Sequence, residues 1–318
     1  MGNQQLRFVL DDAEAGIRLD SFLAEHIDEW SRSRLKKLIE DGDVTVNGAA
    51  VKSSYKLRDG DIVEAELSES PDERFEPEDI PLDVVFEDEY LAVINKPAGM
   101  IVHPGAGVSH GTLANAIAYR FRFSGGDEKT TRVGIVHRLD KDTSGLIVIG
   151  KNELTTEKLS AQFHDRKVTK SYITLVHGFV RKLNGKIDQP IARDRSNRTK
   201  MAVDKNGRNA VSFYSVRKRF EQFTLMDVNI KTGRTHQIRV HMAHLNHPVV
   251  GDETYNAGRD NQIDNPKLRS AVKKLGRFFL HAEKLSFVHP VTKEQREFIQ
   301  PLPDELTMLL TLISEVHS

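Results

Sequence analysis

A loop rich in charged residues, segment 137–145 (HRLDKDTSG), runs into a short apolar stretch. Loops held by a buried strand often carry catalytic groups, because the strand fixes their side chains. Asp140 is flanked by Arg138 and Lys141, and nearby cations keep a carboxylate ionised, so that it can act as a nucleophile or a base. The alternative is an ordinary turn, in which the polar side chains of residues 142–144 hydrogen-bond to their own backbone.

A second segment, 231–241 (KTGRTHQIRVH), alternates apolar and polar residues near its end. This alternation predicts a strand over residues 235–241 that presents Arg239 and His241 on one face. A guanidinium is suited to hold a carboxylate or a phosphate, because its planar fork makes bidentate hydrogen bonds. Arg239 is therefore a candidate partner for a catalytic carboxylate. Arg234, in the turn before the strand, is a candidate phosphate contact.

Four closely spaced histidines offer a metal site as an alternative: His236, His241, His244 and His247. Zinc would need three or four converging ligands, and the chain contains no HExxH pattern. A chain that passes from a strand into a helix or turn scatters such side chains. We therefore expect no metal and interpret the histidines as structural or RNA-contacting residues.

Two further segments contain residues that could contact a nucleic acid. Tyr172, in segment 170–172 (KSY), begins a predicted strand, where aromatic residues usually serve packing. Its functional interpretation is a ring that stacks on a base, with a hydroxyl placed for proton transfer. Lys96, in segment 94–97 (INKP), precedes a turn shaped by proline and glycine. We expect that turn mainly to fix the backbone, with Lys96 as a candidate phosphate contact.

These segments need a scaffold that brings them together. From residue 81 onward, short β-rich runs alternate with turn residues and a few helices. This order predicts an α+β domain over residues 81–318, with a mixed, largely antiparallel β-sheet and flanking helices. The predicted strands cover residues 90–95, 145–150, 172–178, 210–217, 223–231 and 235–241. The predicted helices cover residues 111–121, 154–166 and 303–315.

Residues 15–67 predict a second, smaller α+β domain. Leu19, Phe22 and Leu23 space like one helix face, and a second helix follows that ends at Gly42. An Asn-Gly turn after the strand at residues 44–46 predicts a hairpin, and residues 62–67 predict another strand. The second helix carries four basic residues: Arg32, Arg34, Lys36 and Lys37. The acidic, proline-containing segment 68–80 is predicted to be a linker.

Composition sets the broad class of the protein. With 318 residues, 38% of them hydrophobic and 29% charged, the chain is long for one domain and can form a real core. It contains no cysteine, which excludes disulfides and cysteine-based metal sites. Residues 1–80 hold 10 basic and 20 acidic residues, whereas residues 81–318 hold 36 basic and 26 acidic ones. The positive part could attract a polyanion, although charge alone also fits an ordinary surface.

The targeting features of the chain are few. Residues 1–12 carry charges and lack the apolar core of a signal peptide. The longest apolar stretches are strand-sized, far shorter than a membrane span. We therefore expect a cytoplasmic protein without a membrane partner.

The N-terminal segments resemble a known RNA-binding domain. The segments 18–20 (RLD), 31–39 (SRSRLKKLI) and 42–48 (GDVTVNG) occur in the order typical of the small alpha-L domain, which is S-four-like and named from a small-subunit ribosomal protein. The resemblance covers about fifty residues and implies that the basic helix binds RNA. The alternative is a small α+β fold whose basic residues are merely solvated.

The remaining segments resemble the large-subunit ribosomal RNA pseudouridine synthases of the RluA/RluD type. The matching segments run in order over most of residues 81–303: INKP, HRLDKDTSGL, KSY, TGRTHQIRVH, GD at residues 251–252 and LHA at residues 280–282. One departure is Thr174, where the family often has a small apolar residue. The resemblance leaves open which uridines are modified.

This resemblance implies roles for the residues above. Asp140 would be the catalytic carboxylate, which attacks C1′, adds to C6 or removes a sugar proton. Arg239 would pair with Asp140, and Tyr172 would stack on the uracil and take part in proton transfer. Arg138 would fill the gap left by a flipped uridine. The expected RNA contacts are His137, Arg138, Arg234, Lys96, Arg32, Arg34, Lys36 and Lys37.

The same resemblance implies the partners. Pseudouridine formation involves neither redox change nor group transfer, so we expect no cofactor. We expect a monomer that acts on ribosomal RNA or a pre-ribosomal particle. Two rival classes remain at this point: a non-catalytic RNA-binding or ribosome-assembly factor, and a metal-dependent hydrolase. Detection of pseudouridine in RNA transcripts distinguishes a pseudouridine synthase from the first rival. Metal analysis of the purified protein, with a chelator control on activity, distinguishes it from the second.

Overall fold

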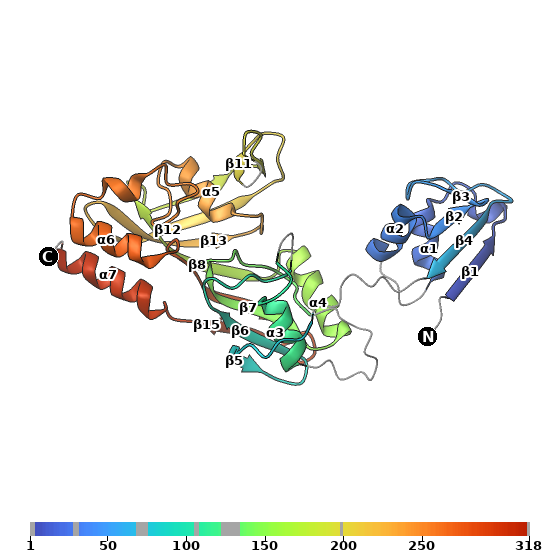
Figure 1. Ribbon diagram of the computed structural model, residues 1–318, viewed down its shortest axis with the longest axis horizontal. Helices are drawn as coiled ribbons and strands as arrows, with labels where there is room; N and C mark the ends of the chain where they lie inside the picture. Colours follow the sequence, from blue (N-terminus) through green and yellow to red (C-terminus); the bar gives the residue numbers. More distant parts are fainter. Residues whose placement is uncertain are drawn as a thin grey trace. The chain divides into compact units, whose positions relative to one another are not determined.

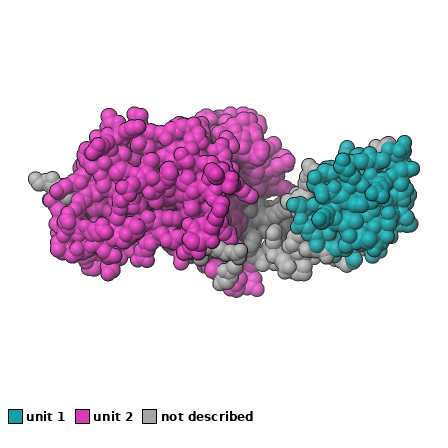
Figure 2. Space-filling model, turned by 90° about the horizontal axis from the view of Figure 1, so that it is seen from above, with its two compact units in different colours: residues 1–74 teal, residues 75–318 magenta. Residues whose placement is uncertain are grey.

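The protein consists of two compact units in a computed structural model, residues 1–74 and residues 75–318 (Figures 1 and 2). Each unit has a hydrophobic core of its own. No helix among the described residues is long and apolar enough to cross a membrane. The structure describes residues 4–27, 32–67, 76–104, 108–121, 134–197 and 200–316.

The first unit combines a four-stranded antiparallel sheet, in the order β1-β4-β2-β3, with two helices. Asn47 and Gly48 both have positive φ angles, 53° and 76°, which is the geometry of a type I′ hairpin turn. The strand β1 lies before residue 15, so the sheet extends beyond the predicted range 15–67. The elements are β1 (Gln4–Val9), α1 (Leu19–His26), α2 (Arg32–Asp41), β2 (Val44–Val46), β3 (Ala49–Ala50) and β4 (Ile62–Leu67).

Both predicted helices of this unit are present and pack into its core. The helix α1 buries Leu19, Phe22 and Leu23, the face that their spacing predicted. The helix α2 buries Leu35, Leu38 and Ile39, and Gly42 follows it with a φ of +89°, a conformation that favours glycine. These side chains form one cluster with the inner faces of β2 and β4.

The second unit is built on a nine-stranded sheet in the order β5-β6-β7-β14-β8-β13-β12-β9, with β15 paired to β14. Every pair is antiparallel except β7 with β14. This confirms the predicted α+β class with a mixed, largely antiparallel sheet. The strands are β5 (Asp83–Glu87), β6 (Leu91–Lys96), β7 (Ser144–Gly150), β8 (Thr169–His177), β9 (Asn184–Asp188), β12 (Val211–Arg219), β13 (Phe223–Ile230), β14 (Leu280–Val288) and β15 (Gln295–Ile299).

Helices pack around this sheet and complete the core (Figure 1). The helices are α3 (Leu113–Arg120), α4 (Glu153–His164), α5 (Gln237–His244), α6 (Pro266–Leu275) and α7 (Asp304–Val316). A small hairpin, β10 (Ile191–Arg193) with β11 (Met201–Val203), stands apart from the main sheet. The central strand β7 is buried at every residue, and its residues 146–149 are continuously apolar rather than alternating.

The predicted strand at residues 235–241 is wrong, because residues 237–244 form the helix α5. All residues from Gln237 to Met242 are buried. A helix buried on every side lacks the amphipathic period that would distinguish it from a strand. The helix begins after His236, which has a left-handed φ of 56°. The predicted exposed face is also wrong, since both Arg239 and His241 are buried.

Residues 76–80, in the second half of the predicted linker, pack against the start of α3. The backbone N–H of Glu78 donates to the Asn115 carbonyl oxygen at 3.1 Å. The Glu78 carboxylate accepts the backbone N–H of Gly111, also at 3.1 Å. This part of the chain is therefore tied to the second unit. Residues 68–75 lie outside the described part of the chain.

Candidate active site

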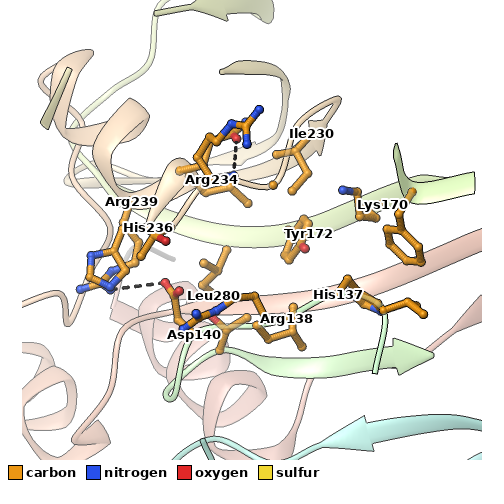
Figure 3. Close-up of a pocket in the computed structure, with 18 of the residues that line it drawn as sticks. His137, Arg138, Asp140, Lys170, Tyr172, Ile230, Arg234, His236, Arg239 and Leu280 are labelled. Atoms are coloured by element: carbon orange, nitrogen blue, oxygen red, sulfur yellow. Dashed lines mark hydrogen bonds and ion pairs between the residues drawn. The ribbon is translucent and has the colours of Figure 1, made fainter. Parts of the chain in front are cut away.

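A pocket of about 360 Å³ opens beside the central strands of the second unit (Figure 3). This volume is within the range of ordinary ligand sites. Its walls come from the loop before β7, the end of α4, the starts of β8 and β14, and the segment that joins β13 to α5. Six of the predicted site residues line it: His137, Arg138, Asp140, Tyr172, Arg234 and Arg239.

Asp140 lies in a tight turn that a buried lysine holds in place. The Thr143 N–H donates to the Asp140 carbonyl oxygen at 3.1 Å, which closes the turn. The Lys96 ammonium donates to the carbonyl oxygens of Lys141, Pro97 and Met100 at 3.0, 2.8 and 2.8 Å. The loop that carries Asp140 is thereby fixed to the end of β6.

These contacts correct the expected role of Lys96. Its side chain is fully buried, and three backbone oxygens occupy its ammonium, so it is not placed to contact a phosphate. Burial, with a smaller contribution from Arg277, lowers the pKa of Lys96 to about 7. Its role in this structure is to anchor the Asp140 loop.

Gly145, which follows the Asp140 loop in the sequence, allows the strands β7 and β14 to approach closely. Gly145, the second residue of β7, has a φ of +109°. A Cβ atom at this position would lie 2.3 Å from the Ala282 carbonyl oxygen of β14. A larger residue would therefore push apart the one parallel strand pair of the sheet, next to the loop that carries Asp140.

Arg239 lies between two carboxylates at one end of the pocket. Its Nη1 is 3.4 Å from Asp140 Oδ2, so the predicted pairing of these two residues is present. Its Nε and Nη2 donate to the two oxygens of Asp252 at 2.7 and 2.8 Å. Burial alone would lower the pKa of Arg239, but the bidentate bond to Asp252 outweighs it and raises the pKa.

Aromatic rings fix the plane of the same guanidinium. The Arg239 Cζ lies 4.2 Å from the centre of the Phe278 ring and 5.0 Å from that of Tyr255. The Tyr255 hydroxyl also hydrogen-bonds to His236 Nδ1 at 2.8 Å. The sequence interpretation missed these supports: it quoted Asp252 as part of a matching segment without a role, and it did not consider Tyr255 or Phe278.

Tyr172 lies on β8, between Asp140 and Lys170 in the view of Figure 3. It is buried, and burial together with the negative charge of Asp140 raises the pKa of its hydroxyl above the ordinary value. The phenol is therefore protonated at neutral pH and available as a hydrogen-bond donor. It could accept a proton only after giving up its own.

His137 and Arg138 differ in what they can offer to a ligand. His137 stacks on Phe163 with ring centres 4.5 Å apart, and its Nε2 accepts the N–H of Val148 at 3.0 Å. Burial, and secondarily the charge of Lys170, lowers the pKa of His137 to about 3, so the ring is neutral. Arg138 is exposed at the pocket and keeps its charge available.

Arg234 lies on the opposite wall, in the segment before α5 (Figure 3). Its Nε donates to the Asn209 carbonyl oxygen at 3.2 Å, and its backbone N–H donates to Gln237 Oε1 at 3.0 Å. The guanidinium has no carboxylate partner among the described residues. Arg234 therefore differs from Arg239, which two carboxylates neutralise.

The basic helix of the first unit is only partly described. Lys36 is exposed and lies 3.6 Å from Glu40, one turn further along α2. The side chains of Arg32, Arg34 and Lys37 lie outside the described residues. The expected RNA contacts on this helix therefore stay predictions.

Three of the four histidines considered as metal ligands have protein partners. His241 lies between Ser212 Oγ and the Gln189 carbonyl oxygen, at 2.9 and 3.0 Å. His247 Nδ1 contacts the His177 carbonyl oxygen at 2.8 Å, and His236 contacts Tyr255 as described. Among the described residues, no three histidine, aspartate or glutamate side chains are grouped so that they could hold a metal ion.

Comparisons with known proteins agree with this geometry. Residues 90–244 match the RNA pseudouridylate synthase family, and residues 17–63 match the S4 domain. The RNA pseudouridine synthase YlyB of Bacillus subtilis is 39% identical over 306 residues, which cover 96% of this chain and 97% of YlyB. The ribosomal large subunit pseudouridine synthase D of Pasteurella multocida is 43% identical over 301 residues, which cover 94% and 91% of the two chains.

A solved structure supports the same conclusion. Human RNA pseudouridylate synthase domain containing 1 aligns with a TM-score of 0.56 and 25% identity, and covers 72% of this chain and 87% of that chain. The fold and the pocket define an RNA-modifying isomerase. The chain belongs to the RNA pseudouridine synthase family and carries an S4 domain near its N-terminus, as the sequence resemblance predicted.

Proposed function

We propose that this enzyme converts specific uridines of large-subunit (23S) ribosomal RNA to pseudouridine, and that it acts in the cytoplasm on ribosomal RNA or a pre-ribosomal particle. The observation that carries the chemistry is the Asp140–Arg239 pair. Asp140 is the one acidic side chain among those that line the pocket. The choice of ribosomal RNA rests on the relatives named as ribosomal large subunit pseudouridine synthase D.

The proposed reaction is an isomerisation. The C1′–N1 bond of uridine breaks, the uracil turns, and C1′ joins C5; N1 gains a proton and C5 loses one. Glycosidases that deliver water use two carboxylates. One carboxylate suffices here, because the leaving base itself returns to C1′. Water must be kept from C1′ meanwhile, and the apolar walls of the pocket at Ile230, Ile238 and Leu280 support this.

Asp140 is proposed as the catalytic carboxylate, and its ionised form is required by each of three routes. It can attack C1′, add to C6 of the uracil, or remove a proton from the sugar. Arg239 lies 3.4 Å away and places a positive charge beside the carboxylate. Because Asp252 and the two aromatic rings hold Arg239, the guanidinium needs little reorganisation when a substrate binds.

Tyr172 is proposed to bind the flipped base, and Arg138 is proposed to fill the space that this base leaves in the RNA. The Tyr172 ring offers a stacking surface inside the pocket for a flipped uracil. Its protonated hydroxyl can donate a hydrogen bond and can relay a proton during loss of the C5 proton. Arg138 is exposed next to Asp140, where its planar fork can occupy the space that the flipped base leaves.

The domain roles are proposed as follows. Residues 15–67 bind RNA as the alpha-L or S4 domain, residues 68–80 link the domains, and residues 81–318 carry the chemistry. The functional form is proposed to be a monomer. Deleting residues 1–67 should weaken RNA binding or broaden the set of modified uridines while leaving turnover possible. An unchanged affinity and an unchanged set of sites would reject the RNA role of this domain.

The test of the proposed function is a map of pseudouridines in large-subunit ribosomal RNA from cells with and without the gene. We expect discrete uridines to lose the modification in the deletion strain and to regain it when the gene is restored. An identical map in both strains would reject ribosomal RNA as the substrate. A purified enzyme that forms no pseudouridine in any RNA fraction of the deletion strain would favour a non-catalytic binding factor.

A further inference from the structure

The charges that line the pocket are unevenly balanced. The cationic side chains are Arg138, Lys170, Arg234 and Arg239, whereas Asp140 is the one acidic side chain among the lining residues. Arg239 is neutralised by Asp140 and Asp252. None of the other three cations forms an ion pair with Asp140 among the described residues, and one of them, the half-buried Lys170, lies at the other end of the pocket from Asp140 (Figure 3).

Lys170 is the second residue of β8, two positions before Tyr172. Among the described residues, no hydrogen bond or ion pair engages its ammonium. Its nearest aromatic neighbour is Phe163 of α4, with Nζ 5.6 Å from the ring centre. On the other wall it faces Gly233, where a Cβ atom would lie 3.7 Å from Nζ. The ammonium is therefore flanked by a ring and by a residue without a side chain.

Lys170 is half-buried. A cation that is shielded from water without an anionic partner is costly, because nothing replaces the water that it loses. Burial lowers the pKa of Lys170 to about 8, yet the ammonium is still mostly charged at pH 7. Its neighbour His137, with a pKa of about 3, is uncharged at neutral pH and therefore does not balance the charge of Lys170. The arrangement thus fits an anion supplied by the ligand.

The position of Lys170 indicates which anion this is. Figure 3 shows Lys170 and His137 at one end of the pocket and Asp140 with Arg239 at the other, with Tyr172 between them. A uracil is neutral, and a second anion next to Asp140 would be repelled by it. An RNA strand whose uracil lies over Tyr172 brings its phosphates to the ends of the site. The end without a carboxylate is the one that suits them.

We propose that Lys170 is a phosphate-binding residue, whose ammonium receives a backbone phosphate of the RNA strand beside the flipped uridine. This inference rests on the proposed function, since it takes the strand that enters the pocket to be RNA. The contact anchors the strand at one end of the pocket while Asp140 faces the reacting nucleotide at the other. Gly233 leaves the ammonium accessible from the opposite wall.

The test is the salt dependence of RNA binding by Lys170→Gln, Lys170→Arg and the unaltered residue. All three are measured in the full chain carrying Asp140→Asn, with a large-subunit ribosomal RNA transcript as the probe. Lys170→Gln breaks no ion pair with a residue that the structure describes, so we expect it to fold. The matched control is Lys167→Gln, which removes an exposed lysine outside the pocket that pairs with Asp165 at 2.9 Å.

The expected result is a change in the salt slope. Each lost phosphate contact lowers the slope of log K against log salt by about 0.7 to 0.9. We expect this decrease for Lys170→Gln, with affinity reduced about three- to tenfold, and a normal slope for Lys170→Arg. Lys167→Gln should leave the slope closer to that of the parent protein than Lys170→Gln does.

Two results would overturn the inference. An unchanged slope for Lys170→Gln would exclude a phosphate contact, and a lower affinity at that unchanged slope would assign Lys170 to a neutral group such as a uracil carbonyl. An equal decrease for Lys167→Gln would show a general charge effect. Pseudouridine formation on the same transcript by protein with Asp140 intact is scored separately, so a failure of the proposed function is distinguished from a failure of this contact.

Discussion

At one end of the pocket Arg239 lies between two carboxylates, whereas at the other end Lys170 has no anionic neighbour among the described residues. The first arrangement is complete before any ligand arrives: the guanidinium is fixed by Asp252, Tyr255 and Phe278. The arrangement at Lys170, by contrast, gains its anion only when the RNA binds, according to our proposal. Paired charges should therefore matter for turnover and stability, and the unpaired charge for binding.

Among changes to the residues around Asp140, the largest effect is expected for Arg239→Ala. It leaves Asp252 buried without its bidentate partner, which should lower the free energy of unfolding by about 3–5 kcal/mol. It also removes the positive charge beside Asp140, and we expect kcat to fall by about 10² to 10³. Denaturant unfolding and single-turnover assays measure the two effects.

Arg234→Ala is the matched control for that change. Arg234 lines the same pocket but donates to a single carbonyl oxygen, that of Asn209. We expect a change in stability within about 0.5 kcal/mol and a smaller loss of kcat than for Arg239→Ala. The reverse order of activity losses would mean that the wrong arginine has been assigned to Asp140.

Asp252→Asn tests whether the second carboxylate positions Arg239. The amide keeps one acceptor but turns an NH₂ group toward the guanidinium, so the fork loses one of its two bonds. A small displacement of a catalytic group costs up to about 10² in rate, and we expect kcat to fall by about 10- to 100-fold with KM little changed. A rise in KM at constant kcat would instead place Asp252 in substrate binding.

The smallest effect is expected from pH at the other end of the pocket. With a pKa of about 8, Lys170 is charged in about a quarter of the molecules at pH 8.5. Because the uncharged form should still bind RNA about three- to tenfold more weakly, as expected for Lys170→Gln, the RNA affinity should be about two- to threefold weaker than when the ammonium is fully charged. Lys170→Arg, which keeps its charge, corrects for titration of the RNA and of other groups. If the unaltered protein and Lys170→Arg show the same pH dependence, titration of Lys170 is not the cause of the weaker binding.

Much of the fold followed from local patterns in the sequence. The strand at residues 62–67, the helix that buries Leu19, Phe22 and Leu23, and the Asn47-Gly48 turn are present as predicted. These elements have one buried face or a turn that needs positive φ angles, and such features leave a clear pattern in the sequence. Residues 237–242 of the helix α5 are all buried, so its apolar and polar residues show no helical period and their alternation suggested a strand.

The candidate site was predictable in part. The segment that contains Asp140 and the pairing of Arg239 with it could be inferred, because long matching segments carry them. The burial of Lys96 could not, since a lysine beside a proline turn looks like a surface residue until the carbonyl oxygens around it are placed. The isolation of Lys170 likewise depends on which side chains surround it, and the sequence does not contain that information.

The central claim is that the ionised Asp140 carries the chemistry while other groups hold the RNA. Asp140→Asn keeps the shape of the side chain and removes its charge. Pseudouridine formation and RNA affinity are measured on the same large-subunit ribosomal RNA transcript. We predict that pseudouridine formation falls by at least about 10³-fold, while affinity stays within about threefold of the unaltered protein. Turnover close to that of the unaltered protein would contradict the account.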